Sequence, residues 1–285
     1  MIYQTIIPVE ELSRHLDDPQ WVVGDCRFSL ADTERGRRDY LQAHIPGAVY
    51  AHLDQDLSGP VVKGQTGRHP LPPLEQAAQV FSAWGIGPGV QVVAYDDAGG
   101  ALAAVRLWWM LRWLGHEAVA VLDGGWQRWL AAGYPVRTGT ESNAGAEFIP
   151  HPRPHLVVTT HEISQLLEDP ASCIVDARTA DRFRGENEVI DPVAGHIPGA
   201  RNLPYPKNLT PEGLFRKPDE LRQMYLEFLG NFPPEKAIFY CGSGVTSIHN
   251  ILAMLHAGLE EPRLYAGSWS EWITDPARPV ALGES

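Results

Sequence analysis

The sequence repeats itself, and this repeat limits the possible folds more than any other feature. Four segments recur in the same order, about 150 residues apart, so a whole domain is duplicated. The pairs are ELSRHLDDPQWVVGDCR (11–27) with EISQLLEDPASCIVDAR (162–178), HIPGA (44–48) with HIPGA (196–200), VVAYDDAGGALAAVRLWWML (92–111) with IFYCGSGVTSIHNILAML (238–255), and VLDGGWQRW (121–129) with LYAGSWSEW (264–272). The predicted organisation is a domain over 1–138, a linker over 139–157 and a second domain over 158–285.

Each copy alternates short apolar runs with helical patterns. Continuous apolar runs such as VQVVAY and AIFYC are typical of strands that are buried on both faces of a parallel sheet. Helices then supply the crossovers between strands. Thr159 and Glu162 have the spacing of a capping box, which predicts a helix from residue 160. The predicted fold class is α/β, with two tandem three-layer α/β/α domains and a mainly parallel sheet in each.

Charge and cysteine usage limit the partners and the compartment. The net charge of −12 argues against nucleic acid and against anionic membranes. Three widely spaced cysteines favour a reducing compartment over a disulfide framework. The first residues lack a basic region followed by a long apolar run, so we expect no signal peptide, and the most apolar stretch is too short to cross a bilayer. We therefore expect a cytoplasmic protein without a membrane partner. The sequence has no evident cluster of metal ligands, and we expect neither a metal site nor a cofactor.

Cys241 is the strongest candidate for a chemical role. It directly follows a predicted strand and precedes Gly242, Ser243 and Gly244 and then an apolar helix. The carboxyl end of a strand in a parallel sheet is where α/β proteins bind ligands. A helix N-terminus and a glycine loop present backbone N–H groups, which favour a thiolate. The sequence therefore predicts a nucleophilic cysteine rather than an inert buried one.

Two observations narrow the chemistry of this loop. The first copy has Asp96 where the second has Cys241, so only the second domain is expected to carry the nucleophile. Cysteine phosphatases need an arginine six residues after the cysteine, to hold phosphate bidentately. That position is Ser247, which disfavours phosphoryl transfer. Cys26 and Cys173 lack a glycine loop and are expected to be core residues.

The duplicated pattern resembles the tandem-domain rhodanese family of sulfurtransferases over nearly the whole chain. The resemblance rests on three motifs, which are HIPGA, YAGSWSEW and the loop CGSGVTS. The loop is similar to the active-site loop of the 3-mercaptopyruvate sulfurtransferases. The thiosulfate-preferring branch usually has basic residues after the cysteine, where this chain has Gly242 and Ser243. The resemblance implies that Cys241 takes sulfur from a small-molecule donor, 3-mercaptopyruvate, and becomes a persulfide. A thiol, such as a thioredoxin-like protein or a low-molecular-weight thiol, or cyanide would then accept it.

The resemblance also implies roles for individual residues. Ser243, His69 and Asp54 would form a catalytic set in which the carboxylate orients the imidazole and the imidazole moves a proton through the hydroxyl. The loop that binds the transferred sulfur would consist of Gly242, Gly244, Val245, Thr246 and Ser247.

Arg182 matches a substrate-binding arginine of the family, and a guanidinium can hold a carboxylate with two hydrogen bonds. A second family arginine is missing from GENEVIDPVAGH (185–196), where Arg184 is the nearest substitute. This departure leaves a thiosulfate sulfurtransferase as the first alternative. A non-catalytic persulfide carrier or binding module is the second alternative.

Overall fold

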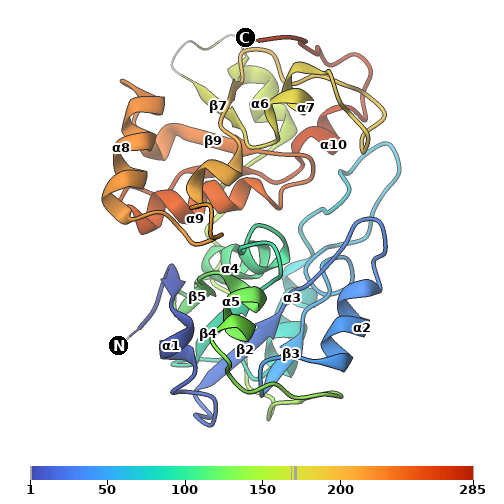
Figure 1. The fold of residues 1–285 in the computed structure, drawn as a ribbon. Helices are drawn as coiled ribbons and strands as arrows, with labels where there is room; N and C mark the ends of the chain where they lie inside the picture. Colours follow the sequence, from blue (N-terminus) through green and yellow to red (C-terminus); the bar gives the residue numbers. More distant parts are fainter. Residues whose placement is uncertain (1, 168, 170–171, 285) are drawn as a thin grey trace. The chain divides into compact units, whose positions relative to one another are not determined.

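The computed structural model of the chain describes residues 2–167, 169 and 172–284. These residues form two compact units, each with one sheet (Figure 1). The first unit comprises Met1–Gly59, Leu71–Arg153 and Pro211–Phe215, and the second comprises Pro60–Pro70, Pro154–Thr210 and Arg216–Ser285. Residues 60–70, here called the arm, therefore lie in the first half of the sequence but belong to the second unit.

The first unit contains a five-stranded sheet in the order β1-β5-β4-β2-β3, with every neighbouring pair parallel. Its strands are β1 (Ile6–Ile7), β2 (Trp21–Asp25), β3 (Ala48–Tyr50), β4 (Gln91–Tyr95) and β5 (Val119–Leu122). Its helices are α1 (Val9–Leu12), α2 (Arg35–Gln42), α3 (Leu74–Ala83), α4 (Ala103–Trp113) and α5 (Gly125–Ala131).

The second unit repeats this topology in the order β6-β10-β9-β7-β8, again with parallel neighbours. The strands are β6 (Val157–Val158), β7 (Cys173–Asp176), β8 (Arg201–Asn202), β9 (Ala237–Tyr240) and β10 (Arg263–Tyr265). The α-helices are α6 (Thr160–Leu166), α7 (Ala180–Arg184), α8 (Pro218–Leu229), α9 (Ser247–His256) and α10 (Ser268–Trp272). Short 3₁₀ helices are η1 (Pro154–Leu156), η2 (Tyr205–Asn208) and η3 (Pro234–Lys236).

Burial explains why these segments form sheets. Every residue of β4 and of β9 is buried, as expected for central strands that helices cover on both faces. Helix α4 packs on β4 and β5, and α9 packs on β9 and β10. Thr159 and Glu162 form the predicted capping box at the start of α6. The predicted fold class is thus confirmed in both copies.

The two units also share a buried ion pair beside the end of their second strand. Arg27 donates to the Asp25 carboxylate and Arg178 to the Asp176 carboxylate, with shortest distances of 2.6 and 2.7 Å. Each guanidinium also lies over a tryptophan ring, that of Trp126 in the first unit and that of Trp269 in the second, and these two tryptophans occupy matching positions in the repeat. Because the pair occurs in both copies, it is part of the scaffold and not of the chemistry.

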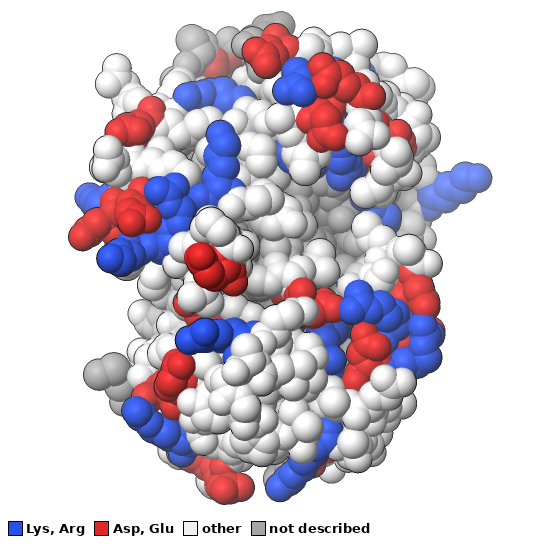
Figure 2. All heavy atoms as spheres, in the orientation of Figure 1, with Lys and Arg blue, Asp and Glu red and all other residues white. Residues whose placement is uncertain are grey.

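Charged side chains of both signs are interspersed on the face of the molecule that Figure 2 shows. Among the residues described, no helix combines the length and the apolar character needed to cross a bilayer.

Candidate active site

The loop of residues 241–247, here called the cysteine loop, joins β9 to α9. Strand β9 is the middle strand of its sheet, so the loop lies at the carboxyl ends of the parallel strands. The residues of α9 from Ser247 to Met254 are all buried. The loop is therefore held between two buried elements, β9 and α9. Cys241 lies at the edge of the sheet where ligand binding is expected.

Cys241 is nearly completely buried, and its surroundings favour the thiolate. Burial alone raises the pKa of a thiol, but four hydrogen bonds act against it. The donors are the side chains of Thr246 and Ser247 and the backbone N–H groups of Ser243 and Ser247. Their sum lowers the pKa of Cys241 below its ordinary value. The loop thus supplies the amides that the sequence predicted.

The hydroxyl groups of Thr246 and Ser247 have an effect on Cys241 that the sequence analysis did not predict. It assigned Thr246 and Ser247 to the loop for their backbone N–H groups alone. In the structure the hydroxyl of each also helps to lower the pKa of Cys241, although Ser247 Oγ is buried and makes no hydrogen bond of good geometry within the described chain. An O–H donor near a thiolate strengthens the anion's hydrogen bonding, so these hydroxyls contribute to the acidity of Cys241.

A second segment, the start of α10, holds the cysteine loop in place. The N–H of Cys241 donates to Ser268 Oγ at 3.1 Å, and the N–H of Trp269 donates to the Cys241 carbonyl at 3.0 Å. Ser268 has a φ of +55°, in the left-handed region that side chains other than glycine rarely adopt. This strained residue thus uses its hydroxyl to fix the backbone of the nucleophile's own residue.

Gly244 is required by the close packing of the cysteine loop. Its φ is +71°, and a Cβ at this position would lie 2.2 Å from the carbonyl oxygen of Ala266. Any larger residue would push the loop away from the segment that precedes α10.

The arm brings His69 to the cysteine loop. His69 Nδ1 and Ser243 Oγ share a hydrogen bond of 2.8 Å, and both residues are buried. The N–H of the neighbouring Arg68 donates to Ser270 Oγ at 3.0 Å. Gly67 makes this approach possible, because a Cβ there would lie 2.6 Å from the carbonyl oxygen of Gly267. The structure therefore brings together Cys241, Ser243 and His69 within the second unit.

Asp54, the third member of the predicted catalytic set, belongs to the first unit. Its side chain is exposed, and its N–H donates to His52 Nδ1 at 3.1 Å. Its part in orienting His69 stays a prediction.

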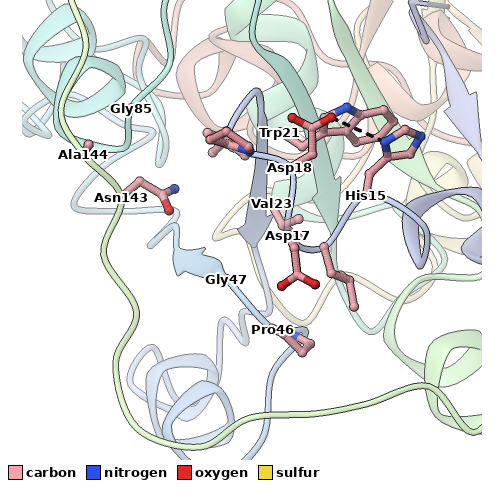
Figure 3. A pocket seen from close by; sticks show the side chains of 13 residues that line it. His15, Asp17, Asp18, Trp21, Val23, Pro46, Gly47, Gly85, Asn143 and Ala144 are labelled. Carbon is pink, nitrogen blue, oxygen red and sulfur yellow. Dashed lines mark ion pairs between the residues drawn. The ribbon is translucent and has the colours of Figure 1, made fainter.

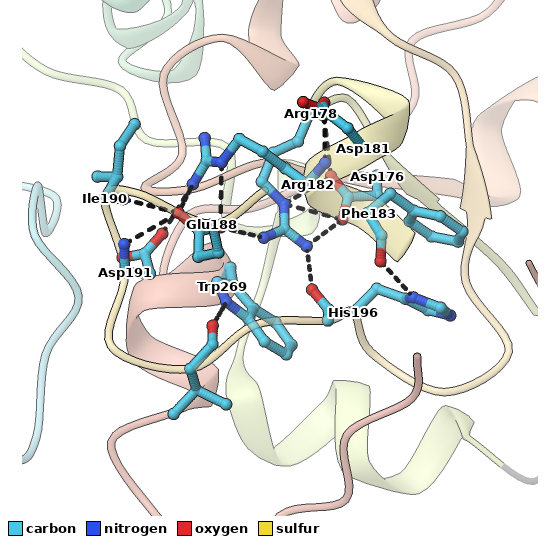
Figure 4. Close-up of polar contacts among 12 residues, drawn as sticks. Asp176, Arg178, Asp181, Arg182, Phe183, Glu188, Ile190, Asp191, His196 and Trp269 are labelled. Carbon is cyan, nitrogen blue, oxygen red and sulfur yellow. Dashed lines mark hydrogen bonds and ion pairs between the residues drawn. The ribbon is translucent and has the colours of Figure 1, made fainter. Parts of the chain in front are cut away.

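Arg182 lies in a buried network of arginines and carboxylates (Figure 4). Its Nε and Nη2 donate to the two oxygens of Glu188 at 3.0 and 2.9 Å, and Nη2 also donates to Asp191 Oδ2 at 3.0 Å. Arg178 joins the same network through Glu188 at 3.3 Å. Hydrogen bonds from Asp191, Ile190 and Arg182 outweigh burial and lower the pKa of Glu188 below its ordinary value.

Arg68 is a residue that the sequence interpretation missed. It donates from Nη1 to Asp191 Oδ1, so Asp191 bridges Arg68 and Arg182 with one oxygen to each. A Cβ on Gly242 would lie 3.1 Å from Arg68 Nη2 and 3.8 Å from Arg182 Nη2, so both guanidinium groups reach the cysteine loop. Arg184, the substitute that the sequence suggested, instead pairs with Glu186 and Glu284.

The other two thiols have different surroundings. Cys26 and Cys173 are buried and unpaired like Cys241, but burial raises the pKa of both. In Cys26 the nearby carboxylates of Asp25 and Asp96 raise it further. Neither thiol is therefore a competing nucleophile.

The matching loop of the first unit, residues 96–102, is here called the aspartate loop. The Asp96 carboxylate is completely buried and accepts from four backbone N–H groups. They belong to Ala98 and Gly100, at 2.9 and 2.8 Å from Oδ1, and to Leu102 and Ala104, at 2.9 and 3.4 Å from Oδ2. Burial is the larger influence and raises the pKa of Asp96 to about 6.

A separate hollow of about 240 Å³ lies in the first unit near the start of β2 (Figure 3). His15 stacks on Trp21 there and approaches Asp18 at 3.6 Å. This end of the strands is opposite to the end that carries the aspartate loop. The described residues contain no group of three or more His, Cys, Asp or Glu side chains that could hold a metal ion.

Comparison with known proteins agrees with this geometry. A family model for the rhodanese-like domain matches twice, at residues 8–132 and 159–275. A probable 3-mercaptopyruvate sulfurtransferase of Pseudomonas aeruginosa is 47% identical over 280 residues, which cover 98% of each chain. The human 3-mercaptopyruvate sulfurtransferase is 37% identical and covers 94% of this chain and 95% of its own. The solved structure of the Leishmania major 3-mercaptopyruvate sulfurtransferase superposes with a TM-score of 0.82 at 34% identity, over 94% of this chain and 74% of that one.

The chain belongs to the rhodanese family, with two rhodanese-like domains in tandem. Within that family it is a sulfurtransferase, as the resemblance of the sequence implied.

Proposed function

We propose that the protein transfers sulfur from 3-mercaptopyruvate to a thiol or to cyanide through a persulfide of Cys241. The observation that carries the proposal is the buried Cys241 thiol with its lowered pKa, which four hydrogen-bond donors surround. Such a site stabilises a sulfur anion both before and after transfer. The names of the relatives at 47% and 37% identity support this donor.

In the first half-reaction the Cys241 thiolate attacks the thiol sulfur of the donor. A sulfur–sulfur bond forms as the bond between sulfur and C3 breaks, and its electron pair leaves on the enolate of pyruvate. The proton of the donor's thiol is then available for C3, so that pyruvate and the Cys241 persulfide anion are the products. This is covalent catalysis, and it predicts ping-pong kinetics.

The contact between Ser243 and His69 supports a role for this pair in moving that proton. Their hydrogen bond of 2.8 Å allows the imidazole to accept a proton through the hydroxyl and to return it to C3. We include Asp54 in this set as the group that orients His69. The loop members Gly242, Gly244, Val245, Thr246 and Ser247 bind the sulfur anion.

In the second half-reaction an acceptor thiolate attacks the outer sulfur of the persulfide. The sulfur–sulfur bond to Cys241 breaks, the Cys241 thiolate is regenerated, and the acceptor leaves as a persulfide; cyanide leaves as thiocyanate. We propose a thioredoxin-like protein or a low-molecular-weight thiol as acceptor, and a cytoplasmic location, which the three unpaired cysteines support.

Intact mass spectrometry tests the proposal directly. After incubation with 3-mercaptopyruvate the protein should gain one sulfur atom, which a reductant removes. A steady-state comparison of kcat/KM should favour 3-mercaptopyruvate over thiosulfate. A strong preference for thiosulfate would establish the first alternative, and a single sulfur transfer without multiple turnover would establish a persulfide carrier.

A further inference from the structure

The second unit contains two guanidinium groups next to the cysteine loop, and their surroundings differ. Both contact Asp191, which has a side chain only 1% exposed and accepts from Arg68 with one oxygen and from Arg182 with the other. The difference concerns the edge of the guanidinium formed by Nε and Nη2. This edge carries two parallel N–H groups and matches the two oxygens of a carboxylate.

In Arg182 that edge is already occupied. Nε and Nη2 donate to both oxygens of Glu188, which is the bidentate arrangement that an incoming carboxylate would otherwise use. Glu188 is held firmly, because its Oε1 also accepts from the N–H groups of Ile190 and Asp191. A substrate that approached this edge of Arg182 would have to displace a buried carboxylate.

In Arg68 the same edge has no partner. Only Nη1 donates to a side chain, whereas Nε is buried and unpaired, and Nη2 has no acceptor within the described chain. Nη2 lies 3.1 Å from the position that a Cβ of Gly242 would take. The edge therefore lies beside Gly242, the residue that directly follows Cys241. A buried N–H without an acceptor is costly, and a carboxylate is its natural partner.

We infer that Arg68 is the residue that binds the carboxylate of the sulfur donor, through Nε and Nη2, while Arg182 with Glu188 and Asp191 holds Arg68 in position. The donor's carboxylate then lies beside Gly242, and its thiol can reach Cys241. The inference rests on the proposed function, because it assigns the recognition of an α-keto carboxylate at that same site.

The test compares two donors that differ only in the carboxylate. They are 3-mercaptopyruvate and 1-mercaptopropan-2-one, which has the same ketone and thiol but a methyl group in place of the carboxylate. Arg68→Lys keeps the charge but loses the bidentate edge. We expect it to lower kcat/KM for 3-mercaptopyruvate about 10- to 100-fold, mainly through KM, with less than about a 2-fold change for the neutral donor. Arg184→Lys is the matched control and should change neither value.

The outcomes separate the alternatives. An equal loss for both donors would mean that Arg68 only holds the arm and His69, and it would overturn the inference. A selective loss in Arg182→Lys with none in Arg68→Lys would also overturn it. Should the lysine variant fail to fold, Arg68→Gln tests the same selectivity. Failure of the proposed function looks different, since the unmodified protein itself would then take no sulfur from 3-mercaptopyruvate.

Discussion

The cysteine loop and the aspartate loop follow equivalent strands and surround different anions. In the first unit four backbone N–H groups surround the carboxylate of Asp96. In the second unit two backbone N–H groups and two hydroxyls surround the sulfur of Cys241. The loop is thus an anion site that the fold supplies in both copies. In the first unit the Asp96 carboxylate accepts the hydrogen bonds of this site. In the second unit the Cys241 thiolate, the nucleophile, accepts them.

The donors differ in a way that matters for reactivity. Thr246 and Ser247 of the cysteine loop correspond to Ala101 and Leu102 of the aspartate loop, which have no hydroxyl. The comparison teaches that backbone N–H groups alone only partly offset the burial of an anion, whereas in the cysteine loop side-chain hydroxyls add to them and the pKa falls below its ordinary value.

The strongest test exchanges the nucleophile between the loops. Cys241→Ser should lower sulfur transfer by at least about 10³-fold, because a serine hydroxyl is not ionised at neutral pH. Adding Asp96→Cys to this variant should restore no measurable persulfide by intact mass, since the aspartate loop lacks the two hydroxyls. Recovery of turnover in the double variant would show that the backbone N–H groups are sufficient.

Removing the hydroxyls should give the next largest effect. Thr246→Val with Ser247→Ala should raise the pKa of Cys241. Since the thiolate is the reactive form, alkylation by iodoacetamide at pH 7 should slow about 10-fold, and its rise with pH should move to higher pH. Thr246→Ser keeps a hydroxyl and serves as the control. An unchanged pH profile in the double variant would assign the lowered pKa to the backbone alone.

A third prediction concerns the stability of the first unit. The pKa of Asp96, about 6, lies above its value in an unfolded chain, so ionisation of Asp96 disfavours the folded state. The free energy of unfolding should therefore decrease as pH rises from about 4 to about 6, by up to roughly 3 kcal/mol from this group. Urea titrations at several pH values should show that the Asp96→Asn variant lacks this part of the decrease in the free energy of unfolding with pH. An identical slope in both proteins would contradict the assignment.

The smallest effect is expected at the start of α10. Ser268 has a φ of +55°, and Gly125 takes the matching place in the first unit with a φ of +52°. Ser268→Ala loses the hydrogen bond to the Cys241 N–H and should cost about 1 kcal/mol of stability. Ser268→Gly loses the same bond but relieves the left-handed strain, so thermal denaturation should place it between the alanine variant and the unmodified protein. A glycine variant less stable than the alanine variant would show that φ carries no strain there.

Much of the fold could be predicted because its signals are local. Runs such as AIFYC identify buried strands, and the loop after Tyr240 is recognisable from adjacent residues alone. Ser243 and His69 came from a family resemblance, and the structure places them in hydrogen-bond contact.

Arg68 shows where sequence reasoning ends. Its pairing with Asp191 joins residues 123 positions apart, and no periodicity or motif encodes such a contact. Nor could the sequence tell that Glu188 occupies the bidentate edge of Arg182, because that depends on side-chain direction within a loop. The hydroxyls of Thr246 and Ser247 are a similar case, since the sequence alone does not show that these side chains lower the pKa of Cys241.

The arm has a consequence for how this duplicated protein could have diverged. A gene fusion normally leaves its halves separable, and a cut between them would release two self-sufficient modules. Here a protease or a stop codon at residues 139–157 would free a C-terminal fragment that retains the sulfur nucleophile but has lost Arg68 and His69. The C-terminal half therefore cannot act alone without rebuilding the part of its site that the N-terminal half of the sequence provides.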